Sequence, residues 1–318
     1  MNNNMPIDIL VTAPLPPFLY EPLKADYRCH DYAAASDKPA LLANVGASIR
    51  GLVQGGGTVT PTTLLDALPN LEMISVFGVG YDGVPTDYCR KRGIKVTNTP
   101  DVLTDDVADV AVALVMMTGR GFVRLNRFVQ AGEWLKRAPE LTNKLGGRTV
   151  GILGLGRIGK AIAQRVTALE MNVAYTGRKP QDVPYRFIAD LKSLAAASDF
   201  LVVACPGGAA TKNIVNAEVL TALGKKGTIV NIARGSIIDE PALVQALQDG
   251  TIKAAGLDVF ADEPRIPAAL MTMDNVVLLP HVGSATRETR QAMGDLCKAN
   301  LDAWAAKKPV LTLIPELV

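Results

Sequence analysis

Histidine, cysteine and aromatic residues are scarce in this sequence. Two of the 318 residues are histidine, four are cysteine and 5% are aromatic. The cysteines show no C-x-x-C spacing, which favours reduced thiols over a disulfide framework or a zinc site. Their positions are Cys29, Cys89, Cys205 and Cys297. We therefore expect a protein of a reducing compartment, the cytoplasm, without a bound metal ion.

The sequence also lacks an excess of charge of one sign and a long hydrophobic run. Its 33 basic and 31 acidic residues give a formal net charge of +2, which predicts neither a nucleic-acid partner nor binding to an anionic membrane. The most apolar segment, VADVAVALVMM, contains Asp109 and is too short to cross a bilayer. The first residues, MNNNMPIDIL, have no basic region and do not resemble a secretory signal.

Short apolar runs alternate with helical patterns along the chain. Before residue 100, strands are predicted at IDILVT, IRGLVQ, LEMISVFG and IKVTN, and helices at TTLLDAL and VPTDYCRKR. The segment NTPDVLTDDVADVAVALVMMTGRG predicts a long helix that Thr104 can cap. Later strands are expected at DFLVVAC, GTIVNIA, AAGLDVF and NVVLLPH, and one last helix at SATRETRQAMGDLCKANLDAWAAKKP.

A glycine-rich turn lies between a predicted strand and a predicted helix. In VGILGLGRIGKAIA, residues 150–163, glycine occurs at 154, 156 and 159, and the next strand begins at Met171. A strand, glycine turn, helix and strand within about thirty residues have the dimensions of a βαβ unit. Gly154 allows a tight turn, and Gly156 lets the backbone approach a pyrophosphate closely. Gly159 lets the helix pack closely on the strand. Phosphates would lie at the helix N-terminus. The alternative is a tight turn without a ligand.

Length and pattern together predict two domains. A chain of 318 residues is too long for one ordinary core, and the last 28 or so residues are too few to fold alone. We expect a discontinuous first domain of residues 1–101 and 288–318, and a dinucleotide-binding domain of residues 102–287. The predicted fold class is α/β, with two doubly wound parallel-sheet domains of the Rossmann-like or flavodoxin-like type. A cleft between them would let a substrate meet a cofactor.

The end of the second strand of the βαβ unit predicts the cofactor. A site for NAD usually has Asp or Glu there, where it binds the ribose 2′-hydroxyl. This sequence instead has Gly177, Arg178 and Lys179. A 2′-phosphate needs cationic donors, so the pattern favours NADPH. The alternative is that both cations are solvated turn residues.

Three titratable residues follow three predicted strands. Arg234 follows TIVNIA, Glu263 follows GLDVF, and His281 follows NVVLLP. Ligands of open α/β sheets bind at the carboxyl ends of the strands, so the three residues form a candidate site. His281 on its own could equally be structural. The other histidine, His30, is interpreted as a surface residue.

Five motifs resemble those of the D-2-hydroxyacid dehydrogenase family in their order and spacing. The sequence is most similar to the glyoxylate/hydroxypyruvate reductase branch of that family. They are VTNTPDVLTDDVADVAVAL, GRTVGILGLGRIGKAIA, VNIARGSIIDEPALVQAL, AAGLDVFADEP and VVLLPHVGSAT. The resemblance implies that Arg234, Glu263 and His281 are catalytic. It also implies that the first domain binds the substrate and that the protein is a homodimer.

Elementary chemistry assigns roles to these residues. Reducing a 2-oxo acid takes a hydride at the carbonyl carbon, supplied by NADPH, and a proton at the carbonyl oxygen. His281 would donate that proton, and Glu263 would hold its imidazole and stabilise the imidazolium. Arg234 would bind the substrate carboxylate and help to polarise the carbonyl.

Two glycine-rich loops belong to the first domain. The loop in SVFGVGYDGVP can form an anion-binding nest, and the resemblance implies that the amides of Val79 and Gly80 bind the substrate carboxylate. An ordinary β-turn is the alternative. The loop LVQGGGTVT offers no side chains at residues 55–57, which suggests a roomy mouth for the substrate.

The resemblance implies further contacts. Thr104 and the Cys205–Pro206 turn would lie along the cofactor, and Asp258 near its nicotinamide amide. The cofactor loop would also include Leu155, Arg157 and Ile158. Relatives often have Leu-Thr-Pro after the Cys-Pro pair, whereas this chain has Gly207, Gly208 and Ala209. Trp134 falls where relatives extend a loop towards the partner subunit's active site, although composition alone fits a core anchor equally well.

The predicted activity is the reduction of glyoxylate and hydroxypyruvate to D-2-hydroxy acids by NADPH, with His281 as proton donor. One alternative is a reductase of bulkier 2-oxo acids, of the 4-hydroxyphenylpyruvate or 2-ketogluconate type. Another is a non-catalytic, dinucleotide-sensing protein similar to a corepressor. The complete Arg–Glu–His set and the lack of a basic tail argue against the sensor.

Overall fold

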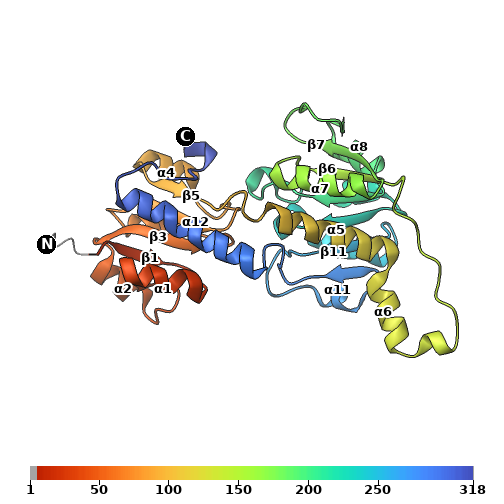
Figure 1. Ribbon diagram of the computed structural model, residues 1–318, viewed down its shortest axis with the longest axis horizontal. Coiled ribbons are helices and arrows are strands. Elements are labelled where there is room, and N and C mark those ends of the chain that lie inside the picture. Colours follow the sequence, from red (N-terminus) through yellow and green to blue (C-terminus); the bar gives the residue numbers. More distant parts are fainter. Residues whose placement is uncertain (1–5, 318) are drawn as a thin grey trace. The chain divides into compact units, whose positions relative to one another are not determined.

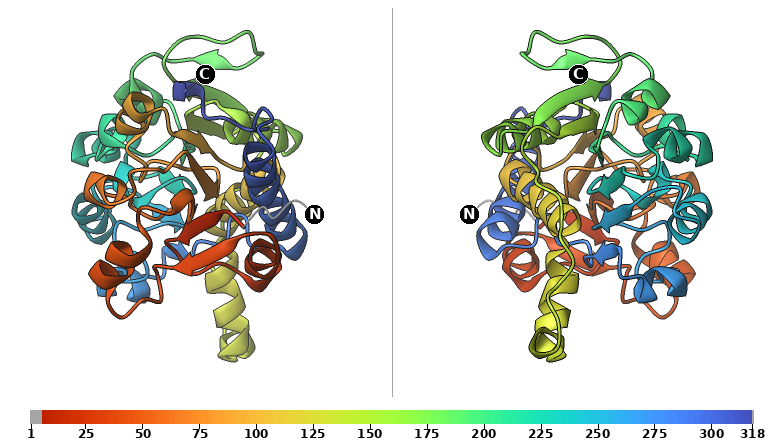
Figure 2. Two further views of the ribbon diagram at one scale, coloured as in Figure 1. Left: turned by 90° about the vertical axis from the view of Figure 1, so that its left-hand side faces the viewer. Right: turned by 90° about the vertical axis from the view of Figure 1, so that its right-hand side faces the viewer.

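The computed structural model describes residues 6–317 and divides into two compact units. The first contains Met1–Leu103 and Thr286–Val318, and the second contains Thr104–Ala285. Each unit has its own parallel β-sheet covered by helices (Figures 1 and 2). The α/β class predicted from the sequence is therefore confirmed.

The first unit has the strand order β2-β1-β3-β4-β5, all parallel, which is the flavodoxin-like order. Its strands are β1 (Asp8–Val11), β2 (Arg28–Asp31), β3 (Ile49–Gly55), β4 (Met73–Phe77) and β5 (Lys95–Thr97). Its helices are α1 (Pro17–Asp26), α2 (Lys38–Val45), α3 (Thr62–Asp66), α4 (Thr86–Arg92) and α12 (Arg287–Ala305). Helix α12 returns from the far end of the sequence to pack against β4 and α1 (Figure 1).

The second unit has the strand order β12-β11-β10-β9-β6-β7-β8, in which the first strand of the unit, β6, lies between β9 and β7, as in a Rossmann fold. Its strands are β6 (Thr149–Leu153), β7 (Asn172–Thr176), β8 (Arg186–Phe187), β9 (Phe200–Val203), β10 (Thr228–Asn231), β11 (Ala254–Leu257) and β12 (Val276–Leu278). Its helices are α5 (Thr104–Arg120), α6 (Phe122–Gln130), α7 (Arg157–Ala168), α8 (Leu191–Ala196), α9 (Ala217–Leu223), α10 (Glu240–Gln248) and α11 (Ala268–Thr272).

Both faces of the second sheet are covered, which explains why its strands are continuous apolar runs. All four residues of β9, β10 and β11 are buried. Helix α5 lies along α7 and against β10 and β11 (Figure 1). Arg165 on α7 joins the two helices through ion pairs with Asp105 and Asp109 of α5. No helix among residues 6–317 is long and apolar enough to cross a membrane.

Helix α6 and the segment after it extend away from the rest of the second unit (Figure 2). The short helix η1 (Glu133–Leu135) follows α6. Three apolar side chains in this arm, which we define as residues 122–141, are largely exposed: Trp134 (67%), Leu135 (93%) and Leu141 (99%). Trp134 is therefore not a core anchor within its own chain.

The structure differs from several of the sequence-based expectations. The long helix starts at Thr104 itself, so Thr104 is its first helical residue rather than the residue before it. Strands β2 and β8 were not predicted, because RCHD is polar and RF has two residues. The interpretation of His30 as a surface residue is wrong. Its side chain is 16% exposed, and its Nε2 lies 2.6 Å from Asp8 Oδ1 on the neighbouring strand.

The packing of Gly159 generates a prediction about stability. A Cβ at Gly159 would overlap the backbone oxygen of Gly154, whereas a Cβ at Gly156 would meet nothing within 4 Å. We expect Gly159→Ala to lower the free energy of unfolding by about 1–3 kcal/mol, since backbone must shift. Gly156→Ala replaces glycine at the N-cap of α7 and should cost about 0.5 kcal/mol. Urea unfolding of both variants measures the difference, and equal losses would contradict this account.

Candidate active site

Arg234, Glu263 and His281 all lie beyond the carboxyl ends of neighbouring strands. Arg234 follows β10, Glu263 follows β11, and His281 follows β12, and these three strands are adjacent at one side of the sheet. Because parallel strands all end at the same edge, residues far apart in the sequence are brought to one place.

Glu263 and His281 form a hydrogen-bonded pair. His281 Nδ1 lies 2.7 Å from Glu263 Oε2, and the backbone N–H of Phe260 donates to the other carboxylate oxygen at 3.0 Å. Both carboxylate oxygens are therefore held, and the ring of His281 is oriented by the first of them. In this arrangement Nε2 is the ring nitrogen that can exchange a proton with a ligand.

The pKa of Glu263 lies below its usual value. Burial alone would raise the pKa, but the hydrogen bonds from His281 and Phe260 and the charges of His281 and Arg234 outweigh it. The carboxyl is thus held in its ionised form. The positive charge of Arg234 is among the causes that lower this pKa.

His281 has a left-handed backbone conformation, with φ of 55°, that residues other than glycine rarely adopt. Asp258 holds it there. The backbone N–H of His281 donates to the Asp258 carbonyl, and those of Val282 and Gly283 donate to the two carboxylate oxygens at 2.8 Å each. Asp258 is 1% exposed, and burial raises its pKa in spite of these hydrogen bonds. Its side chain therefore positions the loop of the histidine.

Backbone contacts tie the loops of Arg234 and Glu263 together. A Cβ at Gly235 would overlap the carbonyl group of Phe260, so only glycine fits beside Arg234. The side chain of Asn231, buried at the end of β10, donates to the Arg234 carbonyl at 2.9 Å. Glu240, the first residue of α10, accepts a hydrogen bond from the Ala261 N–H at 3.0 Å. These contacts hold in place the two loops from which the side chains of Arg234 and Glu263 extend.

In the first unit, the loop after β4 presents unused backbone donors. The carbonyls of Gly78 and Val79 accept hydrogen bonds from Thr99 N and Asn98 Nδ2. The N–H groups of Val79 and Gly80, by contrast, donate to no residue among those that the structure describes. Adjacent free N–H groups in a glycine-rich turn form an anion-binding nest.

The second glycine-rich loop, residues 55–57, packs against the first. A Cβ at Gly56 would lie 3.0 Å from the Gly80 carbonyl oxygen, and one at Gly78 would lie 2.9 Å from Gly56 Cα. The glycine at position 56 is therefore explained by close contact between two backbones. This differs from the sequence-based interpretation, in which the absence of side chains widened the substrate mouth.

The glycine turn of the second unit matches a dinucleotide phosphate site. Gly154 has a φ of 97° and lies so close to the Cys205 backbone that a Cβ would be 2.7 Å from it. Gly156 faces open space, and no side chain caps the N-terminus of α7. The residues present thus fit a pyrophosphate, because a helix N-terminus binds anions and the space at Gly156 is open.

A cavity of about 760 Å³ opens beyond the ends of β6 and β7. Gly177 and Arg178 line it, as the position of the cofactor motif predicts, whereas Lys179 does not. Sequence reasoning missed Lys192, on the first turn of α8, and Lys212, in the segment after β9, which also line the cavity. It also missed Asp190, whose carboxylate caps α8 by accepting from Ser193 N at 2.7 Å.

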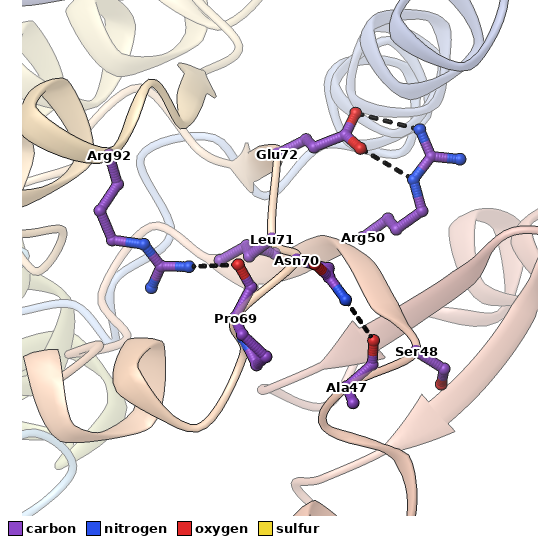
Figure 3. A pocket seen from close by; sticks show the side chains of 8 residues that line it. All are labelled: Ala47, Ser48, Arg50, Pro69, Asn70, Leu71, Glu72 and Arg92. Carbon is purple, nitrogen blue, oxygen red and sulfur yellow. Dashed lines mark hydrogen bonds and ion pairs between the residues drawn. The ribbon is translucent and has the colours of Figure 1, made fainter.

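Another cavity, of about 490 Å³, lies in the first unit (Figure 3). It is at the amino ends of β3 and β4, opposite to the edge where ligands of parallel sheets bind. Its polar groups are satisfied internally: Arg50 pairs with Glu72, and Arg92 donates to the Pro69 carbonyl. Its lining residues are Ala47, Ser48, Arg50, Pro69, Asn70, Leu71, Glu72 and Arg92.

Comparison with known proteins gives consistent results. Residues 112–283 match the family described as D-isomer specific 2-hydroxyacid dehydrogenase, NAD binding domain. Hydroxyphenylpyruvate reductase of Plectranthus scutellarioides is 44% identical over 96% of this chain and 98% of its own. The 2-ketogluconate reductase of Gluconobacter oxydans is 45% identical over 96% and 97%. A crystal structure of NADPH-dependent glyoxylate/hydroxypyruvate reductase from Sinorhizobium meliloti, in complex with NADP and malonate, is 43% identical with a TM-score of 0.90, over 98% of this chain and 97% of that one.

The chain belongs to the D-isomer-specific 2-hydroxyacid dehydrogenase family. It is thus an oxidoreductase of 2-hydroxy and 2-oxo acids with a nicotinamide-dinucleotide domain. The family match covers the strands that carry Arg234 and Glu263 and extends through His281. The resemblance drawn from the sequence motifs is confirmed at this level.

Other residues that shape the site carried little signal in the sequence. The side chains of Asn98, Asn231 and Glu240 form hydrogen bonds with backbone groups that are distant in the sequence or lie in irregular loops. A pattern of apolar residues predicts strands and helices, but not which loop a polar side chain reaches. Their position next to strand ends is the one signal that could have suggested them.

The lowered pKa of Glu263 predicts how stability depends on pH. Since the pKa is lower in the folded state than in the unfolded chain, the ionised carboxylate stabilises the fold above the ordinary glutamate pKa of about 4.3. This contribution is lost as the pH falls through the folded-state value. In Glu263→Gln it is missing at every pH. We therefore expect the difference in free energy of unfolding between wild type and variant to shrink between pH 6 and pH 3.5, as followed by urea unfolding. A constant or growing difference would contradict the prediction.

Proposed function

We propose that this protein is an NADPH-dependent reductase of small 2-oxo acids, glyoxylate and hydroxypyruvate, which it converts to D-2-hydroxy acids. The observation that carries the proposal is the Glu263–His281 pair beside Arg234 at the ends of three neighbouring strands. An acid that can give a proton to a carbonyl oxygen, next to a cation that can bind a carboxylate, is what reduction of a 2-oxo acid needs.

The proposed cofactor site consists of the glycine turn and the cavity next to it. The pyrophosphate would be held by Gly154, Leu155, Gly156, Arg157, Ile158 and Gly159. The adenosine ribose would be bound by Gly177, Arg178 and Lys179. The nicotinamide half would be bound by Thr104, Cys205, Pro206 and Asp258. Bound NADPH would supply the hydride for the carbonyl carbon. The cavity carries Arg178 and Lys212, which favours a 2′-phosphate. Of its acidic residues, Asp190 is engaged in capping α8 and Glu218 pairs with Lys192.

In the proposed reaction, protonated His281 donates its Nε2 proton to the substrate carbonyl oxygen, which becomes the hydroxyl group. Glu263 keeps the ring oriented through Nδ1 and stabilises the imidazolium before the transfer. The N–H groups of Val79 and Gly80 and the guanidinium of Arg234 bind the substrate carboxylate. In the reverse direction neutral His281 accepts the hydroxyl proton.

A reductase of bulkier 2-oxo acids is the second candidate. The relatives include a hydroxyphenylpyruvate reductase and a 2-ketogluconate reductase, whose identities of 44% and 45% to this chain are similar to the 43% of an Arabidopsis thaliana glyoxylate/hydroxypyruvate reductase. Overall identity therefore does not select among these substrates. The side chains next to the keto acid must do so.

The test is oxidation of NADPH, and separately of NADH, by the purified protein with glyoxylate, hydroxypyruvate or phenylpyruvate. We expect turnover with NADPH and the two small acids. Preference for phenylpyruvate would favour the second candidate, and equal use of NADH would contradict the cofactor assignment. Absence of turnover with all three would favour the non-catalytic sensor.

Arg178 provides a sharper test of the cofactor. We expect Arg178→Gln to raise the KM for NADPH at least tenfold, because a charge-assisted hydrogen bond to the 2′-phosphate is worth about 1.5–3 kcal/mol, and to leave the KM for NADH nearly unchanged. Lys226→Gln is the control, since Lys226 is exposed just before the amino end of β10 and does not line the cavity. A similar effect of both variants on both cofactors would contradict this role of Arg178.

We also propose a homodimer in which the arm, residues 122–141, contacts the second subunit and Trp134 reaches its active site. The exposed apolar side chains of the arm support this. Sedimentation should give twice the chain mass of 33.7 kDa, and Leu135→Asp should shift the protein towards the monomer. Leu311→Asp, which changes an exposed leucine of the first unit, is the control. A monomeric wild type would contradict the proposal.

A further inference from the structure

Arg290, on the first turn of α12, has an unusual environment for an arginine. Its guanidinium lies over the ring of Phe77, with 5.8 Å between Cζ and the ring centroid, and the residue is partly buried. Burial lowers its pKa, and no carboxylate among residues 6–317 pairs with it. By comparison, Arg165 is paired with two aspartates, and Arg92 donates to three backbone carbonyls. A partly buried cation without a counter-charge or hydrogen-bond acceptor is costly to keep.

The surroundings of Arg290 place it beside the substrate loop of the first unit. Phe77 ends β4 and directly precedes the loop whose N–H groups at Val79 and Gly80 are unused. The ring of Phe18 lies 6.3 Å from that of Phe77. Phe18 also packs against α12 one turn beyond Arg290, where a Cβ at Gly294 would lie 3.1 Å from its ring. The guanidinium thus lies over the ring of Phe77, which is itself near the ring of Phe18 and directly precedes an anion-binding turn.

We propose that Arg290 is a specificity residue that donates hydrogen bonds to an oxygen on C3 of the substrate, so that 2-oxo acids with a hydroxyl group there are preferred over those with an alkyl or aryl group. This inference rests on the proposed function. The substrate carboxylate occupies the N–H groups of Val79 and Gly80, and the guanidinium meets the next acceptor along the ligand. A methyl or phenyl group in that position would displace water from Arg290 and return no hydrogen bond.

Two ligands that differ by one hydroxyl group test the proposal. D-glycerate and D-lactate are titrated calorimetrically into the protein with NADPH bound, a combination in which no reaction takes place. We expect wild type to bind D-glycerate at least tenfold more tightly than D-lactate, the ratio expected for a hydrogen bond to a charged group. In Arg290→Met the ratio should fall to within about twofold, through weaker binding of D-glycerate. Arg290→Lys, which keeps the charge without the planar fork, should retain part of the ratio.

Arg287→Met is the matched control, because Arg287 is exposed on the same helix turn, and it should leave the ratio unchanged. Equal weakening of both ligands by Arg290→Met would assign Arg290 to the shared carboxylate or to the fold and overturn the proposal. A wild-type ratio near one, or no binding of either ligand, would overturn it as well. Oxidation of NADPH by wild type with glyoxylate tests the proposed function separately, because glyoxylate has no C3.

Discussion

The hydrogen bond between Glu263 and His281 requires the ends of two neighbouring strands to be held in one fixed relation. Glu263 follows β11 and His281 follows β12, so a small shift of either loop would separate Oε2 from Nδ1. Asp258, at the end of β11, prevents such a shift by binding three consecutive backbone N–H groups after β12. The left-handed backbone of His281 is a consequence of this clamp. Orientation of the imidazole is therefore a property of the sheet edge as a whole.

Glycines are the second constraint on the fold, and their physical roles differ. Gly159 and Gly235 have backbone atoms of another segment where a side chain would be. Gly156 faces open space at the N-terminus of α7, so what requires glycine there is the ligand rather than the protein. In the first unit Gly56 and Gly78 let two loops touch and so support the turn at Val79 and Gly80. Both units thus use close backbone contact to shape an anion-binding turn.

The treatment of charge separates structural from functional side chains. Arg50, Arg92 and Arg165 are satisfied by carboxylates or carbonyls of the chain itself, and they stabilise the places where they lie. Lys192 at the cavity around Arg178 is likewise paired, with Glu218, whereas no carboxylate among the described residues pairs with Arg290. A cation without a counter-charge next to an anion-binding turn can form its hydrogen bonds and ion pairs with a ligand instead.

Sequence alone determined the alternation of strands and helices, the glycine turn and the three titratable residues at strand ends. Each depends on local pattern: apolar runs of the length of a strand, glycine at fixed spacing, and a polar residue directly after an apolar run. The polar strand β2 and the pairing of His30 with Asp8 escaped that reasoning, because a partner on a neighbouring strand leaves no periodic signal. Tertiary structure decided the rest. That Asp258 clamps the histidine loop, that Gly56 is needed for packing, and that Arg290 lies over Phe77 all depend on segments brought together across long stretches of chain. Such contacts are set by strand order and loop path, which no local pattern contains.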